Sequence, residues 1–312
     1  MKALAIDLGG THAAIALVDG PKLVHIETLS TDRAKGLKPL LPQFTEALRR
    51  VLAATETKVE ECIGIAFGFA GLVDNRTGFV VSTNKKYDDA LEVDLPNWCR
   101  ESFGIKFRIE NDARMALLGE AYAGAARGMT NAVIITLGTG IGGAALIEGK
   151  LLRGNHMQAG CLGGHMPVLF SGRKCTCGSI GCAEAEASGW ALPLIVREWP
   201  GIDKSTLAAS SEVGFKELFE QAQNGDAAAL AIRDRCLNVW AANAVGLVHM
   251  YDPEVIVMGG GVMKSAGVIV PYVQDYVAKH AWTPWGKVQV RAAELGNHAG
   301  LLGTIPLLTE GV

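Results

Sequence analysis

Apolar runs separated by glycine-containing turns fill the first thirty positions of the chain. Residues 4–7, 13–18 and 23–27 form such runs, and Gly9 and Gly10 separate the first two. Short apolar runs bounded by glycine are typical of strands joined by tight turns. The pattern therefore predicts a meander of three antiparallel strands at the N-terminus.

Longer periodic segments follow and predict helices between further strands. We expect a helix at about residues 38–55, a buried strand in CIGIAFGFAGLVD, and a strand running into a helix in FRIENDARMALLGEAYAG. Apolar side chains recur at helical spacing from Leu237 to Val248, which is typical of one buried helix face, and the strand EVIVMGGGVM comes next. The alternation of strands and helices indicates an α/β fold.

The second half of the chain repeats the pattern of the first. LAIDLGGTHAAIALVDGPKLV, which starts at residue 4, aligns with VIITLGTGIGGAALIEGKLL, which starts at residue 133. Such self-similarity is typical of two domains of one ancestral fold, and 312 residues are enough for two domains. We expect the boundary between them inside the helix that follows Asp112.

Composition narrows the class of protein. With 49% hydrophobic and 20% charged residues, the chain can bury a core, and a net charge of −3 gives no reason to expect binding to nucleic acid or to a membrane surface. The start, MKALAIDLGG, has Asp7 after a short apolar run, and no later stretch offers a membrane span, so we expect neither a signal peptide nor an anchor. Seven cysteines without a signal are typical of the reducing cytoplasm.

Two turns rich in glycine and threonine stand at matching positions of the repeat. They are the first hairpin, residues 7–11, and the second hairpin, residues 136–143. Glycine lets backbone N–H groups approach an anion, and a threonine hydroxyl adds a donor. Either one alone is more typical of an ordinary turn, but two matching copies favour phosphate binding. The glycines at 259–261 could likewise pass close to a nucleotide, although alone they also fit a turn.

Asn111 and Asp112 lie between a predicted strand and a predicted helix. A carboxylate at such a strand end could accept a proton from a substrate hydroxyl. The alternative is a helix N-cap, which Asn and Asp both favour. The two interpretations do not compete, because one residue can cap the helix while its neighbour catalyses.

Three of the seven cysteines lie within KCTCGSIGCAE, and a histidine precedes them. Cys175, Cys177 and Cys182 have the spacing C-x-C-x4-C, and His165 lies ten residues upstream of the first. Three thiolates and one imidazole make a common tetrahedral zinc site. A redox pair would need C-x-x-C, which the stretch lacks, so we favour structural zinc over a redox role or over unrelated thiols.

Together these motifs resemble the ROK family of sugar kinases and related repressors, within the actin-like ATPase superfamily. The resemblance extends over essentially the whole chain. Its most specific part is Gly164-His165 followed by the Cys-x-Cys-Gly-x-x-Gly-Cys-x-Glu motif at 175–184. The resemblance implies two actin-like ATPase (ribonuclease H-like) domains with mixed sheets that flank a central cleft. We expect a domain of residues 1–113, completed by about residues 300–312, and a larger domain of residues 114–299.

The resemblance also implies a reaction, the ATP-dependent phosphorylation of a hydroxyl of a hexose or N-acylhexosamine with Mg²⁺, in which Asp112 is the catalytic base. The implied sugar contacts are Asn84, Asn111, His165 and Glu184. The implied contacts to ATP and its phosphates are Asp7, Gly9, Gly10, Thr11, Gly138, Thr139, Gly140, Gly259, Gly260 and Gly261, with Asp7 also near Mg²⁺. The implied zinc ligands are His165, Cys175, Cys177 and Cys182, and the implied assembly is a homodimer.

One departure from the family pattern bears on the substrate. Family kinases usually read A-G-E-[apolar]-G-H before the zinc ligands, whereas this chain reads AGCLGGH and places Cys161 or Leu162 where the sugar-binding Glu is expected. Lys85 and Lys86 also replace the small or apolar residues that usually follow Asn84. A sugar-binding protein without catalysis therefore stays open as an alternative. A transcription regulator is disfavoured, because the first hairpin leaves no room before it for a helix-turn-helix.

Overall fold

The structure is a computed structural model, and it describes residues 1–83, 85–209 and 213–310. Contacts within the chain divide it into two compact units. The N-terminal unit comprises Met1–Gly128, Leu151–Cys161 and Glu294–Val312, and the C-terminal unit comprises Met129–Lys150 and Leu162–Ala293. The last residues of the chain therefore complete the N-terminal unit.

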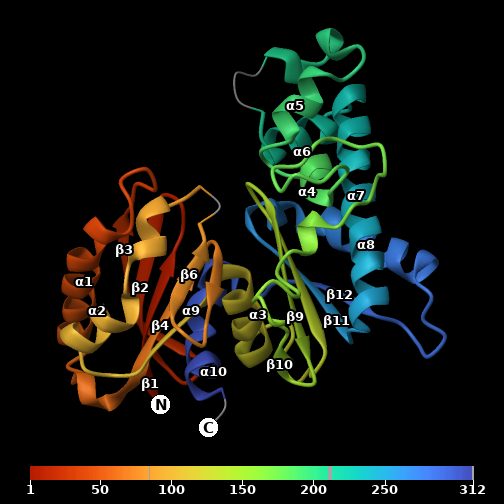
Figure 1. Cartoon of the computed structure of the whole chain (residues 1–312). Coiled ribbons are helices and arrows are strands. Elements are labelled where there is room, and N and C mark those ends of the chain that lie inside the picture. The colour runs from red at the N-terminus through yellow and green to blue at the C-terminus, as the bar shows by residue number, and fades with distance from the viewer. Residues whose placement is uncertain (84, 210–212, 311–312) are drawn as a thin grey trace. The chain divides into compact units, whose positions relative to one another are not determined.

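A five-stranded mixed sheet forms the centre of the N-terminal unit (Figure 1). Its strands, in spatial order, are β3 (Lys22–Ser30), β2 (His12–Asp19), β1 (Lys2–Leu8), β4 (Cys62–Phe69) and β7 (Phe107–Asn111). The first three are antiparallel, as the sequence predicts, whereas β4 runs parallel to β1 and β7 runs parallel to β4. A separate ribbon consists of β5 (Leu72–Asp74) and β6 (Phe79–Ser82).

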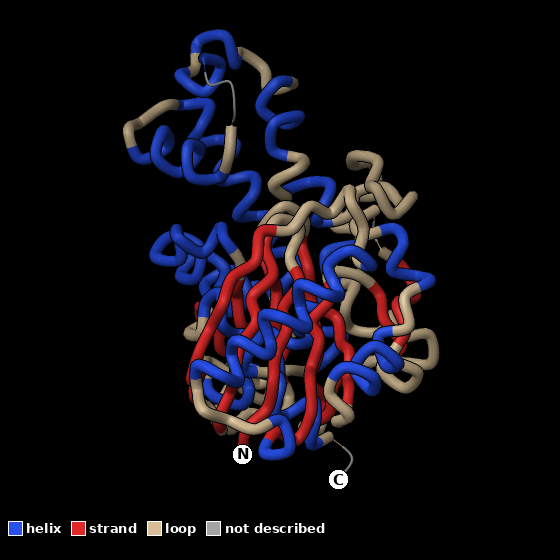
Figure 2. Tube along the Cα trace, turned by 90° about the vertical axis from the view of Figure 1, so that its left-hand side faces the viewer, coloured by secondary structure: helices blue, strands red, loops and turns tan. Residues whose placement is uncertain are grey.

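Helices cover this sheet because each presents an apolar face to it. The helices of the unit are α1 (Leu41–Ala54), α2 (Leu95–Ser102), α3 (Asp112–Ala123), α9 (Ala299–Leu302) and α10 (Thr304–Thr309). Helix α1 buries Phe44, Leu48 and Val51 at helical spacing and lies across β2 and β3 (Figure 2). Helices α9 and α10 contact β1, so residues from both ends of the chain share one core.

The sheet of the C-terminal unit repeats this plan. Its order is β10 (Lys150–Leu151), β9 (Ile141–Ile147), β8 (Ala132–Leu137), β11 (Val255–Gly259) and β12 (Gln289–Ala292). Strands β8 and β9 are antiparallel, as β1 and β2 are, and the pairs β8/β11 and β11/β12 are parallel, as β1/β4 and β4/β7 are. The internal repeat read from the sequence is thus a repeat of sheet topology.

The helices of the C-terminal unit are α4 (Ala183–Ala187), α5 (Leu192–Arg197), α6 (Phe215–Gln223), α7 (Ala227–Tyr251) and α8 (Ala266–His280). Asp226 caps α7 by accepting a hydrogen bond from the Ala229 N–H, and the apolar face predicted from Leu237 onwards is buried except for the partly buried Val245. Helix α7 packs against α4, α6 and α8, and α8 packs beside β12. The α/β class with mixed sheets is confirmed. In the described part of the chain, no helix combines the length and the apolar character that a membrane span requires.

Candidate active site and metal centre

Asp7 lies near the end of β1, directly before the first hairpin. Two glycines make room for its carboxylate: a Cβ at Gly68 would lie 3.1 Å from Oδ1, and a Cβ at Gly300 would lie 2.6 Å from Oδ2. Burial, and secondarily the negative charge of Asp112, raise the pKa of Asp7 from 3.8 to about 7. At neutral pH this carboxyl is therefore poised between its two protonation states, and a nearby cation would favour the carboxylate.

Asn111 is the N-cap of α3, as one of the two sequence interpretations proposed. Its Oδ1 accepts hydrogen bonds from the N–H groups of Ala113 (3.1 Å) and Arg114 (3.3 Å). Its Nδ2 donates to the Gly71 carbonyl and to Asp112 Oδ1, both at 3.0 Å. These four bonds occupy the amide group, so in this structure Asn111 orients Asp112 rather than offering a free group to a ligand.

Asp112 is the first residue of α3, and its two carboxylate oxygens differ in their hydrogen bonds. Oδ1 accepts hydrogen bonds from Asn111 and, at 2.8 Å, from the Ala113 N–H, while Oδ2 has no hydrogen-bond partner among the described residues. The side chain keeps exposed surface, yet surrounding protein atoms remove part of its hydration and raise its pKa. The hydrogen bond from Ala113 and the charge of Lys86 oppose this rise. Asp112 thus combines increased basicity with an oxygen that a hydroxyl can reach.

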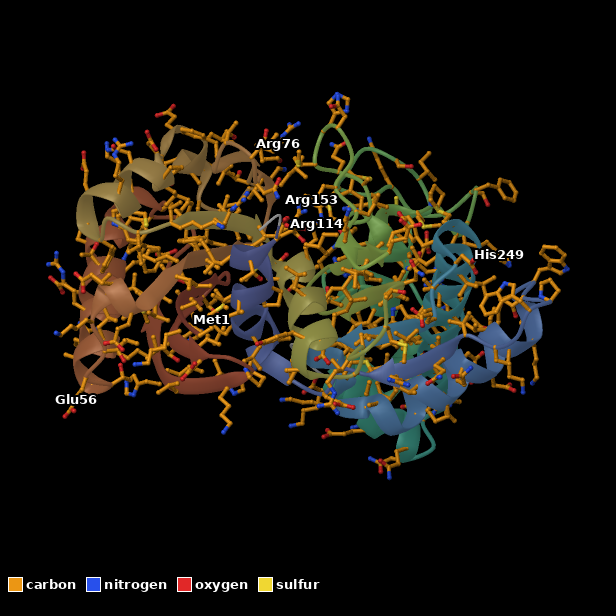
Figure 3. All side chains as sticks on the ribbon, turned by 90° about the horizontal axis from the view of Figure 1, so that it is seen from below. Met1, Glu56, Arg76, Arg114, Arg153 and His249 are labelled. Atoms are coloured by element: carbon orange, nitrogen blue, oxygen red, sulfur yellow. The ribbon has the colours of Figure 1, made fainter. Side chains whose placement is uncertain are left out.

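A buried ionic network holds the segment that carries Asn111 and Asp112. Glu110 Oε1 accepts a hydrogen bond from the Asn111 N–H at 2.9 Å and pairs with Arg114 at 3.3 Å, and Glu110 Oε2 pairs with Arg153 at 2.6 Å. Arg153 also pairs with Glu310, and Figure 3 shows Arg114 and Arg153 close together. The sequence gives one local sign of this network, the acid–base pair Glu110 and Arg114 at helical spacing, and no sign of its partners Arg153 and Glu310.

The first hairpin is closed by its own backbone and anchored by a buried tyrosine. The Gly9 N–H donates to the His12 carbonyl at 2.9 Å. The Tyr87 hydroxyl donates to the Gly9 carbonyl at 2.7 Å and bonds Thr31 Oγ1 at 2.9 Å. Tyr87 is 1% exposed and has a left-handed backbone with φ of 55°. Its role in supporting the hairpin had no signal in the sequence.

A cavity of about 1110 Å³ lies beside the second hairpin, within the C-terminal unit. Its walls include Gly138, Thr139, Trp190, Phe215, Gly261 and Val268. Charged side chains also line it, namely Lys216, Glu217, Glu220, Arg233 and Lys264. A cavity that combines apolar walls with polar groups can bind a small molecule, and this volume is sufficient for a nucleoside. Of the predicted phosphate-binding residues, Gly138 and Thr139 line the cavity directly.

The three glycines at 259–261 have different surroundings. Gly259 ends β11, and Gly261 lines the cavity. Gly260 has φ of 92°, a region that favours glycine, and a Cβ there would overlap the Leu137 carbonyl. Gly260 therefore lets the end of β11 approach β8 next to the second hairpin.

His165, Cys175, Cys177 and Cys182 come together, as their spacing predicts. Their possible ligand atoms all lie within 4.8 Å of one another. Cys177 Sγ and Cys182 Sγ are 3.7 Å apart, and Cys175 Sγ is 3.5 Å from His165 Nδ1. Zn–S bonds of about 2.3 Å and Zn–N bonds of about 2.0 Å put the corners of a tetrahedron about 3.5–3.8 Å apart. The donor set and its separations therefore fit a tetrahedral zinc ion. We refer to these four residues as the Cys3His cluster.

Two predicted sugar contacts are part of the motif that contains this cluster. His165 turns Nδ1 toward Cys175, which leaves Nε2 on the opposite side of the ring. Glu184, in α4, accepts hydrogen bonds from the Ile141 N–H at 2.9 Å and from Trp190 Nε1 at 3.2 Å. Glu184 is therefore joined to the second hairpin, a contact that the sequence did not reveal. The remaining predicted sugar contact, Asn84, lies outside the described residues.

Comparison with known proteins agrees with these motifs. The sequence profile of the ROK family matches residues 3–310. A glucokinase of Thermotoga maritima is 32% identical over 320 residues, covering 100% of this chain and 98% of that protein. The solved ROK hexokinase from Thermus thermophilus has a TM-score of 0.82 and 30% identity, with 100% of both chains covered. A ROK family glucokinase from Streptomyces griseus, solved with glucose and AMPPNP, has a TM-score of 0.75 and 28% identity, again with both chains fully covered.

Two further relatives differ in what their names state. An N-acetylmannosamine kinase of Haemophilus influenzae is 27% identical over 307 residues, covering 97% of this chain and 94% of that protein. A xylose repressor of Bacillus spizizenii is 26% identical over 249 residues, covering 80% of this chain and 61% of that protein. The family profile nonetheless spans nearly the whole chain, and the two matching sheets are those of the two-domain actin-like ATPase fold. The chain belongs to the ROK family.

Proposed function

We propose that this ROK protein is an ATP-dependent kinase that phosphorylates a hydroxyl of a hexose or N-acylhexosamine. The observation that carries the proposal is Asp112, whose free Oδ2 and raised pKa suit a general base. The relatives named above that are glucokinases, a hexokinase or an N-acetylmannosamine kinase support the same reaction class.

In this mechanism Asp112 Oδ2 accepts the proton of the attacking hydroxyl, while Asn111 and Glu110 hold the carboxylate in place. In the C-terminal unit, the second hairpin offers backbone donors to phosphate groups, and the cavity beside it receives the adenosine. In the N-terminal unit, the first hairpin offers backbone donors of the same kind. Mg²⁺, when bound, neutralises charge between the phosphoryl groups. The half-buried Asp7 is the carboxylate that would hold this ion, because Mg²⁺ prefers oxygen ligands.

The sugar contacts of this proposal are Asn84, His165 and Glu184, and Asn111 acts chiefly through Asp112. His165 offers Nε2, because Nδ1 faces the Cys3His cluster, and each oxygen of Glu184 keeps a lone pair beyond the bonds to Ile141 and Trp190. Zinc in the cluster is structural in this account, since four protein ligands leave no open position.

A panel of sugar substrates tests both the proposed reaction and the effect of the missing Glu on sugar affinity. Without the Glu that the family pattern leads us to expect before the zinc motif, one or two sugar hydroxyls lose an acceptor, which costs about 1–3 kcal/mol. Glucose should then show a KM about 10–100-fold above that of a ROK glucokinase, and an epimeric or substituted sugar should suffer less. The assay is ATP turnover with Mg²⁺ and glucose, mannose, allose, fructose, N-acetyl amino sugars or a sugar acid. If glucose has the highest kcat/KM, with a KM below about 1 mM, this account of the sugar site is wrong.

A sugar-binding protein without catalysis is the second candidate. Its only support is that Cys161 or Leu162 stands where the family pattern has a sugar-binding Glu. It predicts sugar binding without ATP turnover on any sugar of the panel. A DNA-binding regulator predicts specific binding to DNA, for which the net charge of −3 provides no attraction.

We further propose that the chain acts in the cytoplasm, where ATP is available, and as a homodimer. Phe170, Trp282 and Trp285, all in the C-terminal unit, are 97%, 80% and 57% exposed, and an interface that covered them would remove apolar surface from water. Light scattering at micromolar concentration should give a dimer, and a monomer would refute this part of the proposal.

A further inference from the structure

We propose that Glu184 is a positioning residue for the second hairpin, and that through it nucleotide affinity depends on metal occupancy of the Cys3His cluster. This inference rests on the proposed nucleotide site beside the second hairpin. All of the contacts involved lie within the C-terminal unit. They form a short chain from the cluster to α4, from α4 to the hairpin, and from the hairpin to the wall of the cavity.

The first step joins the Cys3His cluster to α4. Cys182 is the residue that directly precedes α4, and its Sγ lies 3.2 Å from the His165 carbonyl. The Ala183 N–H donates to the Met166 carbonyl at 3.0 Å. A metal held by Cys182 and His165 therefore fixes the beginning of the helix that carries Glu184.

The second step joins α4 to the second hairpin. One Glu184 oxygen accepts from the Ile141 N–H at 2.9 Å, and the other accepts from Trp190 Nε1 at 3.2 Å. The segment after α4 adds two backbone bonds: the Gly189 N–H donates to the Gly138 carbonyl, and the Trp190 N–H donates to the Thr139 carbonyl, both at 2.9 Å. Three hydrogen bonds thus bind α4 and its C-terminal extension to the hairpin, and the bond between Glu184 and Trp190 holds the extension to α4.

Close packing reinforces the same link from two sides. A Cβ at Gly164, the neighbour of His165, would overlap the Ile141 carbonyl. A Cβ at Gly189 would lie 2.7 Å from the Gly138 carbonyl. The hairpin is therefore enclosed between the loop that provides His165 and the segment that follows α4, and movement of either segment must displace it.

The third step leads to the ligand. Gly138, Thr139, Gly189 and Trp190 all line the cavity. Gly138 and Thr139, whose carbonyls accept hydrogen bonds from the segment after α4, are therefore residues that would contact a nucleotide. Ile141, which donates to Glu184, belongs to the same hairpin. The far end of α4 is held independently, because the buried Glu186 pairs with Arg235 of α7. Loss of the metal should thus release the start of α4 and Glu184 rather than the whole helix.

Thermodynamic linkage makes the coupling between metal binding and nucleotide binding reciprocal. If the metal orders the hairpin for nucleotide, then nucleotide must tighten metal binding by the same factor, and couplings of this kind are typically 5–150-fold. We expect about a tenfold effect, because the coupling passes through a few hydrogen bonds and leaves the cavity walls in place.

The experiment titrates ADP, with Mg²⁺ in excess, into the zinc-loaded full chain and into chelator-treated protein, by calorimetry. The expected result is a Kd about tenfold higher without zinc, restored when zinc is added back. Zinc-loaded Glu184→Gln should bind ADP more weakly than zinc-loaded wild type. The ratio of its ADP Kd values without and with zinc should be close to one. Glu220→Gln is the matched control, because that carboxylate also lines the cavity but has no bond to the hairpin, so it should keep the full ratio.

The reciprocal measurement covers the case in which chelated protein unfolds. Competition with a chromophoric chelator gives the zinc affinity of the folded, loaded protein, and ADP should raise it about tenfold in wild type but not in Glu184→Gln. If ADP binds wild type but changes zinc affinity by less than about twofold, the coupling is refuted while the nucleotide site stands. If zinc-loaded wild type fails to bind ADP even at millimolar concentration, the proposed function itself fails.

Discussion

Glu110 and Arg114 form an ion pair at 3.3 Å in which neither side chain has any exposed surface. The second Glu110 oxygen pairs with Arg153 at 2.6 Å, and Arg114 donates to the carbonyls of Leu152 and Ala159 at 3.1 and 2.7 Å. One carboxylate therefore pairs with two cations directly before Asn111 and Asp112, and Glu310, which pairs with Arg153, supplies the second negative charge. The network also joins the segment of residues 151–161 to the rest of the N-terminal unit.

Glu110→Gln should be strongly destabilising. Removing one partner of a buried pair leaves an uncompensated charge, here that of Arg114, and typically costs about 3–5 kcal/mol. Urea unfolding of variant and wild type measures the difference. Arg76→Ala, which breaks an exposed pair with Asp74, is the control and should cost less than about 1 kcal/mol. Equal losses in the two variants would show that the buried network contributes no special stability.

Tyr87→Phe should weaken ATP binding more than sugar binding. The variant keeps the buried ring but removes the hydroxyl that bonds the Gly9 carbonyl and Thr31, at a cost of about 1–2 kcal/mol in stability. Because the first hairpin loses this anchor, the KM for ATP should rise several-fold. Tyr272→Phe, whose hydroxyl bonds the exposed side chain of Asn238, is the control and should change neither KM. A sugar KM that rises as much as the ATP KM would argue against this role.

The repeat and its glycine turns predicted the fold well, because strand–turn–strand patterns are local. The meander, α1, α7 and both hairpins follow from apolar runs and helical spacing. The cysteine spacing likewise predicted a cluster, since three of its four members lie within eight residues. Glu184 was expected to contact the sugar. Its bond to Ile141 joins residues 43 positions apart, and neither the strand–turn–strand pattern nor the cysteine spacing relates such residues.

The ionic network escaped prediction for the same reason. Arg153 is 43 positions from Glu110 and 157 positions from Glu310, and no periodicity relates such partners. Charged residues are usually solvated, so a sequence gives no sign that Glu110 and Arg114 are completely buried. The network forms only when β7, α3, the segment 151–161 and the residue after α10 pack together in the N-terminal unit.

Asp7 should make stability depend on pH. Its pKa is about 7 in the folded protein and near 3.8 in the unfolded chain, so between these values the folded state binds more protons. The contribution of Asp7 to stability is therefore complete below about pH 4 and is lost as the pH rises through 7, with a slope of at most about 1.4 kcal/mol per pH unit. Urea unfolding without Mg²⁺ at several pH values, for wild type and Asp7→Asn, should give profiles that converge toward low pH. Parallel profiles would contradict the raised pKa.

Zinc should be present at about one ion per chain, and Cys177→Ser should release it. The serine hydroxyl is a poor substitute for a thiolate, so the start of α4 should loosen. Elemental analysis after dialysis in metal-free buffer measures the stoichiometry. Cys161→Ser, outside the cluster, is the control and should retain the metal. Purified wild type with less than about a tenth of an equivalent would refute the zinc site.

Phosphoryl transfer by Asp112→Asn tests the central claim most directly. Asparagine has nearly the same shape and can still accept the hydrogen bond from Ala113, but it cannot take the proton of a hydroxyl. We expect a kcat about 10²–10⁴-fold below wild type on the best sugar of the panel, with the Kd values for sugar and ADP nearly unchanged. Asp275→Asn, on the exposed face of α8, should keep full activity. A kcat for Asp112→Asn within a few-fold of wild type would show that Asp112 is not the base.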